Sequence, residues 1–143
     1  MSREEIKEIL TKSKTVAVVG LSRNPDKDSY NVSAYLKKQG FRIIPVNPFA
    51  GKILGEKSYK DLLEIPVEIQ KNIDVVDVFR PAKDVPIIVE QAVRLNKAHG
   101  KPCVIWMQLG IVNEQAAAMA KKAGLTVVMD KCMMVEHQRL VQG

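Results

Sequence analysis

The sequence has 143 residues, of which 46% are apolar and 27% charged, a size and balance typical of one globular domain. No apolar run approaches the ~18 residues of a membrane span, and residues 1–14 mix Glu and Lys where a secretory signal needs an apolar core, so we expect a cytoplasmic protein without a membrane segment. The net charge of +6 is spread among acidic residues, with few aromatic side chains to stack on bases, so we expect no nucleic-acid partner.

The first predicted elements are a helix, a strand and a second helix. Ser2 and Glu5 have the spacing of a capping box, and the apolar residues that follow recur at helical spacing, which predicts a helix over residues 2–13. A continuous apolar run over residues 15–20 predicts a parallel strand covered on both faces. After a polar loop, residues 29–39 predict a helix that Gly40 closes.

The second strand is predicted over residues 41–48. Pro45 in this strand has no N–H to donate, which favours an edge or a strand-end position. The later elements are expected to be a short helical turn over residues 58–63, a strand over 74–79, a long helix over 82–99, a strand over 102–107, a helix over 112–123, a strand over 125–129 and a final short helix or tail over 132–140.

Predicted helices that end in glycine directly before a strand recur at Gly40, Gly100 and Gly124, which is the pattern of repeated βα units. The predicted fold class is therefore α/β: a three-layer, Rossmann-like, doubly wound parallel sheet of about five strands, in the order 3-2-1-4-5. We expect a single domain over residues 1–143. Ligands of such sheets bind at the carboxyl ends of the strands, here beside the first strand.

The loop after the first strand does not have the fingerprint of a dinucleotide site. That fingerprint needs three glycines, whereas only Gly20 is present and Ser22 stands where the second glycine would be. An NAD site also needs an acidic residue at the end of the second strand, where this sequence has Asn47. NAD and FAD are therefore disfavoured.

The same loop has the composition of a phosphate-binding loop. Hydroxyl, amide and cationic side chains stand together with backbone N–H groups at the start of a helix, an arrangement that suits a diphosphate; they are Ser22, Arg23, Asn24, Lys27 and Ser29. A solvated polar turn is the alternative, because Asn-Pro-Asp is also good turn chemistry.

Four segments resemble the small single-domain coenzyme A-binding proteins, whose domain is similar to the CoA-binding domain of the succinyl-CoA synthetase α subunit. They are AVVGLSRNP at residues 17–25, IPVNP at 44–48, VDVFRP at 76–81 and WMQLG at 106–110. The resemblance covers almost the whole chain and keeps the four motifs in order. It implies coenzyme A as the ligand.

The resemblance also implies a set of ligand-contacting residues. The loop residues Gly20, Leu21, Ser22, Arg23, Asn24 and Lys27 would take the diphosphate, and Val46, Asn47 and Pro48, with Lys52 nearby, would lie against the adenosine. Phe79 and Arg80 would add an apolar contact and a cation, while Trp106, Met107 and Gln108 would line the path of the adenine or pantetheine. Core packing is the alternative for Phe79, Trp106 and Met107. For Arg80 the alternative is a bond to a carbonyl or a pair with a surface acid, and for Asn47 and Pro48 it is a simple turn.

No catalytic triad or metal-ligand spacing is evident, and neither His99 nor His137 has an obvious partner in the sequence. Cys132 follows the fifth strand, and Lys131 beside it favours the thiolate. A mixed disulfide between Cys132 and the thiol of coenzyme A is therefore a hypothesis, with an unreactive cysteine as the alternative.

The function that these residues favour is non-catalytic binding of coenzyme A or an acyl-CoA, as a carrier, sensor or regulatory protein. The synthetase carries its phosphorylated histidine on a further domain that we do not expect here. The alternatives are a subunit of an acyl-CoA-handling enzyme completed by a partner chain, a nucleotide-dependent oxidoreductase, or an interaction module whose Arg23, Lys27 and Arg80 are paired internally. An alanine-rich helix face at residues 116–120 could also support a homodimer.

Overall fold

The computed structural model describes residues 1–142 and has a five-stranded parallel sheet at its centre. Gly143, the last residue of the predicted domain, lies outside the described residues. The strands are β1 (Thr15–Val19), β2 (Arg42–Val46), β5 (Val75–Val78), β6 (Val104–Met107) and β7 (Thr126–Val128), and they lie in the order β2-β1-β5-β6-β7. The α/β, Rossmann-like class predicted from the sequence is confirmed.

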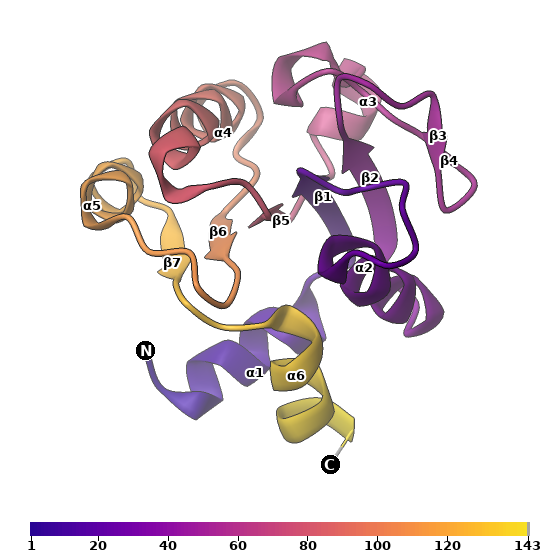
Figure 1. The fold of residues 1–143 in the computed structure, drawn as a ribbon. Coiled ribbons are helices and arrows are strands. Elements are labelled where there is room, and N and C mark those ends of the chain that lie inside the picture. The colour runs from indigo at the N-terminus through magenta and orange to yellow at the C-terminus, as the bar shows by residue number, and fades with distance from the viewer. Residues whose placement is uncertain (143) are drawn as a thin grey trace.

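Helices cover both faces of this sheet, which gives three layers (Figure 1). One face carries α4 (Val85–His99) and α5 (Glu114–Lys122), and the other carries α1 (Arg3–Lys12), α2 (Asp28–Lys38) and α6 (Met133–His137). The short α3 (Val67–Gln70) precedes β5, and residues 138–142 form a π-helical turn after α6. Each face has its own apolar core, so most strand residues are buried on both sides of the sheet.

The predicted strand order is wrong in one respect. The third long strand, β5, pairs with β1, so numbering the long strands along the chain gives the order 2-1-3-4-5 rather than 3-2-1-4-5. Pro45 supplies the physical reason, because it leaves β2 without one N–H and so makes β2 a poor interior strand. Among residues 1–142, the outer side of β2 forms one isolated bridge, between Val46 and Tyr59. The Tyr59 N–H donates to the Pro45 carbonyl at 3.1 Å, and the Tyr59 carbonyl accepts the Asn47 N–H at 2.9 Å.

The connection from β2 to β5 holds elements that the sequence did not predict. It contains a small hairpin, β3 (Lys52–Ile53) and β4 (Glu56–Lys57), followed by a 3₁₀ turn at Leu62–Glu64 and then α3. The expected helical turn over residues 58–63 is thus displaced toward the carboxyl end. A second 3₁₀ turn, Ala82–Asp84, leads into α4. The other predicted elements lie within a few residues of their expected bounds.

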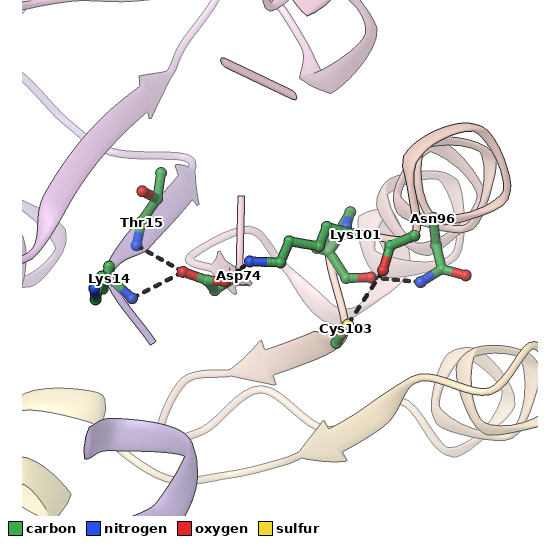
Figure 2. Close-up of polar contacts among 8 residues, drawn as sticks. Lys14, Thr15, Asp74, Asn96, Lys101 and Cys103 are labelled. Carbon is green, nitrogen blue, oxygen red and sulfur yellow. Dashed lines mark hydrogen bonds and ion pairs between the residues drawn. The ribbon is translucent and has the colours of Figure 1, made fainter. Parts of the chain in front are cut away.

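At the amino end of the sheet a carboxylate joins three strands (Figure 2). Asp74 Oδ2 accepts the backbone N–H groups of Lys14 at 2.8 Å and Thr15 at 3.0 Å, and its Oδ1 lies 2.6 Å from Lys101 Nζ. Burial alone would raise the pKa of Asp74, but the Lys101 ammonium and the two backbone N–H groups outweigh it and hold that pKa below its usual value. The starts of β1, β5 and β6 are therefore tied together while Asp74 is ionised.

We expect Asp74→Ala to lower the free energy of unfolding by about 2–3 kcal/mol at pH 7, because two backbone N–H groups and an ammonium lose their acceptor. Lys101→Met should have a smaller effect, since the lysine side chain is 43% exposed. Because the folded-state pKa is lowered, the contribution of Asp74 is present above its unfolded pKa and is lost as the pH falls through the folded value. Urea denaturation at pH 7 and pH 3 measures both effects; equal losses for the two variants at pH 7 would contradict this account.

Candidate functional site

The loop between β1 and α2 begins at a glycine that the packing requires. Gly20 has φ +90°, and its N–H donates to the carbonyl of Val46 at 2.9 Å. A Cβ added at this position would lie 2.9 Å from the carbonyl oxygen of Phe79 and 3.0 Å from Cδ of Arg80. Only glycine therefore allows the ends of β1 and β5 to approach each other here.

The polar side chains of the loop hold its own backbone. The hydroxyl oxygen of Ser29 accepts the N–H of Ser22 at 2.9 Å, and the Ser22 hydroxyl oxygen in turn accepts the N–H of Asn24 at 3.0 Å. Asn24 Oδ1 accepts the N–H of Asp26 at 2.9 Å. Ser22 and Asn24 thus fix the shape of the loop in addition to any contact with a ligand.

Some backbone N–H groups of the loop have no hydrogen-bond partner in the described part of the chain, although Leu21 and Ser29 among them are buried. The N–H groups of Leu21, Arg23, Asp28 and Ser29 donate to no acceptor among residues 1–142. Those of Asp28 and Ser29 belong to the first turn of α2, where the helix presents its positive end. Free N–H groups at the start of an 11-residue helix are suited to an anion such as a phosphate.

A cleft of about 500 Å³ opens beside this loop, on the α4 side of the sheet. It lies at the carboxyl ends of β1 and β2, between the chain that follows them and the first turns of α4, which agrees with the location that doubly wound sheets favour for ligands. Of the predicted site residues, the structure brings six together in its lining: Gly20, Ser22, Val46, Asn47, Pro48 and Arg80.

Sequence reasoning missed more than half of the residues that line the cleft. The additional lining residues come from the end of β1, from the chain after β2, from the 3₁₀ turn before α4 and from α4 itself; they are Val19, Phe49, Lys60, Asp61, Asp84, Ile87, Ile88 and Gln91. One of them gave a signal in the sequence. Ile87 stands at a position that helical periodicity places away from the core, and in the structure its side chain is 62% exposed. Phe49, which is 88% exposed, gave no such signal.

Asn47 connects the end of β2 to the loop. Its Nδ2 donates to the carbonyl of Leu21 at 3.0 Å, and its Oδ1 accepts the N–H of Phe49 at 2.8 Å. The hydroxyl of Ser58 donates to the Asn47 carbonyl. The amide therefore places the backbone at two sides of the cleft, and a contact with adenosine stays a prediction.

The cationic residues predicted for the site differ in their pairing. Arg80 Nη2 lies 2.9 Å from Asp84 Oδ2, within the cleft. Arg23 and Lys27 are exposed and form no ion pair with any residue in the described part of the chain. The internal pairing considered for all three cations is thus found only for Arg80.

The structure places the fourth-strand residues in the protein interior, away from the cleft. Trp106 and Met107 are fully buried on opposite faces of β6, and the Trp106 indole N–H donates to the carbonyl of Lys131 at 2.8 Å. Phe79 is half-buried against the α2-side core. Cys132 is also half-buried against that core and does not line the cleft.

Gln108, the remaining predicted contact, binds a buried carboxyl group. Its Nε2 donates to Oδ1 of Asp77 at 2.6 Å, and both side chains are buried. Burial raises the pKa of Asp77 to about 7, although the hydrogen bond from Gln108 lowers it in part. Asp77 Oδ2 and the Ser33 hydroxyl have no hydrogen-bond partner among residues 1–142.

Both histidines are bound to side chains outside the cleft. His99 Nε2 lies 2.9 Å from Gln70 Oε1, and His137 Nδ1 lies 2.7 Å from the hydroxyl of Tyr35. Burial lowers the pKa of His137. Within residues 1–142 no group of three or more His, Cys, Asp or Glu side chains could hold a metal ion, and no helix there is long and apolar enough to cross a membrane.

Comparison with known proteins identifies the family. The protein YneT of Bacillus subtilis is 43% identical over 136 residues, covering 95% of this chain and 94% of that protein. A solved structure of a protein from Pyrococcus horikoshii OT3 is 39% identical, with a TM-score of 0.89 over 99% of this chain and 93% of the other. Acetate–CoA ligase [ADP-forming] II of Archaeoglobus fulgidus is 44% identical over 80 residues, which are 54% of this chain but only 11% of the ligase. The family model of the CoA binding domain matches residues 14–138, so the chain belongs to the family of CoA-binding domains.

Proposed function

We propose that this protein binds coenzyme A, or an acyl derivative of it, in the cleft beside the Gly20 loop. The observation that carries the proposal is the coincidence of a CoA-binding family match over residues 14–138 with a cleft whose volume is ordinary for a small-molecule site. The cleft is lined by the cations Arg80 and Lys60 and by Gly20 and Ser22 of the loop. The same loop leads to the backbone N–H groups at the start of α2 that are unpaired among the described residues. These groups suit the diphosphate of the ligand.

The end of β2 supports coenzyme A over a nicotinamide dinucleotide. Dinucleotide sites place a carboxylate there for the ribose hydroxyls, whereas this chain has the neutral Asn47. A carboxylate would repel the 3′-phosphate that distinguishes coenzyme A, and an amide does not. We assign Arg23, Asn24 and Lys27, which are exposed on the loop, to the same phosphate-binding surface.

We further propose that the protein does not itself catalyse a reaction and serves as a carrier, sensor or regulatory protein. In support, both histidines are engaged in hydrogen bonds outside the cleft. A second candidate, the CoA-binding part of an enzyme completed by a partner chain, is favoured by the relation to acetate–CoA ligases. Formation or hydrolysis of acetyl-CoA by the purified chain alone would contradict the non-catalytic role.

We expect isothermal titration calorimetry to show that coenzyme A binds far more tightly than NAD, and that dephospho-coenzyme A binds about tenfold more weakly than coenzyme A, because a charged contact is lost. Arg80→Gln should weaken the binding of coenzyme A. Arg94→Gln is the matched control, since Arg94 is exposed on α4 and does not line the cleft. Preference for NAD, or binding of neither ligand, would overturn the proposed function.

A further inference from the structure

Inside the cleft the arginine expected to meet a phosphate already has an anionic partner. Arg80 Nη2 and Asp84 Oδ2 lie 2.9 Å apart, and both residues line the cleft. The arginine side chain is 51% exposed and that of the aspartate 33%, so both are within reach of a ligand. The cleft that we propose for an anionic ligand thus contains a carboxylate, that of Asp84, paired with its cation Arg80.

The Asp84 side chain pairs with Arg80 and does not cap the helix that follows it. It is the residue that precedes α4, a position at which an aspartate usually accepts an N–H from the first helical turn. Here its side chain makes no such bond, and Pro86 has no N–H to offer. The carboxylate is therefore not explained by helix capping.

Arg80 in turn lies against the phosphate loop. A Cβ added to Gly20 would be 3.0 Å from Cδ of Arg80, so the arginine stem passes over that glycine before its guanidinium reaches Asp84. The guanidinium thus links the loop that binds phosphate to the start of α4. An ion pair between residues four apart, with partners this exposed, contributes little to stability and is readily exchanged for another anion.

We propose that Asp84 is a specificity-determining residue, whose carboxylate competes with the phosphate of the ligand for the guanidinium of Arg80. The inference rests on the proposed function only in that the ligand carries a phosphate group. A monoanionic ligand would replace Asp84 as the partner of Arg80 with a group of similar charge, and so would gain little. A phosphate or diphosphate brings more charge and more acceptor oxygens to the same guanidinium. Asp84 therefore lowers the affinity of the cleft for anions in general and favours ligands that are rich in phosphate.

The test is a calorimetric titration of inorganic pyrophosphate, and in parallel of coenzyme A, into the intact chain and its variants. Asp84→Asn keeps the shape and an acceptor oxygen but removes the charge, and we expect it to bind pyrophosphate roughly five- to tenfold more tightly. Asp61→Asn removes a charge from the same cleft without touching Arg80, because Asp61 accepts the N–H of Glu64. Its gain should be smaller, about twofold.

The interaction with Arg80 is isolated by a double-mutant cycle. In the Arg80→Gln background, the gain from Asp84→Asn should fall to that of Asp61→Asn. An unchanged or weaker affinity of Asp84→Asn for pyrophosphate would overturn the inference and assign Asp84 the role of positioning Arg80. If coenzyme A binds no variant while pyrophosphate shows the expected gain, the proposed function fails and the inference stands. If coenzyme A binds wild type but pyrophosphate binds no variant, the inference fails alone.

Discussion

Gly20→Ala is expected to abolish coenzyme A binding and to lower the free energy of unfolding by roughly 2–4 kcal/mol. Two effects add at this position. The backbone has φ +90°, which an L side chain adopts only at a cost, and the new methyl group would lie 2.9 Å from the Phe79 carbonyl oxygen. To relieve that contact, β1 and β5 must move apart at their carboxyl ends, where the cleft begins.

Gly40→Ala is the matched control for this experiment. Gly40 also has a positive φ, +101°, but a Cβ there would meet no atom within 4 Å. We expect this variant to lose only about 1 kcal/mol of stability and to bind coenzyme A as wild type does. Urea denaturation and calorimetry measure both quantities; an equal loss of binding in the two variants would show that backbone strain alone, and not the approach of β5, explains the result.

The second large effect is expected at Asp77. Its pKa of about 7 in the folded protein lies well above the value of an unfolded aspartate, so the unfolded chain releases this proton at lower pH than the folded one. The contribution of Asp77 to stability is therefore fully present below about pH 4 and is lost as the pH rises toward 7, by an amount on the order of 4 kcal/mol. Above pH 7 it decreases no further.

Asp77→Asn should remove this dependence, because an amide does not ionise, while its Oδ1 still accepts the hydrogen bond from Gln108. We expect the variant to be more stable than wild type at pH 8, with the difference between the two proteins reversing or vanishing near pH 4. Asp74 and His137, whose pKa values are both lowered, change stability in the opposite direction but act equally in the two proteins. If the difference in stability between Asp77→Asn and wild type were constant between pH 4 and pH 8, it would contradict a raised pKa of the buried Asp77.

The fold class could be predicted because the local sequence patterns agree with the strands that pair in the sheet. Apolar runs bounded by glycine, such as that ending at Gly20, become strands buried on both faces. The strand order could not be read in the same way, because it depends on how the connection of residues 47–74 crosses the sheet. The position of Pro45 already favoured an edge for β2, and that evidence was stronger than the assumed order.

The candidate site was only partly predictable, for a geometric reason. Residues at the strand ends, such as Asn47 and Arg80, reach the cleft because the carboxyl ends of parallel strands meet at one edge. Trp106 and Met107 still belong to the paired part of β6, where side chains point alternately into the two cores. Asp84 and Ile87 come from a helix start whose position over the strand ends is fixed by tertiary packing alone.

The two outer strands of the sheet are protected against addition of a strand from another molecule. Pro45 removes a donor from the free side of β2, and the bridge from Tyr59 occupies part of what remains. At the opposite margin β7 has only three residues, too few to template an extended ladder. Aggregation by edge-to-edge pairing is thereby disfavoured, and any self-association should involve the helical layers.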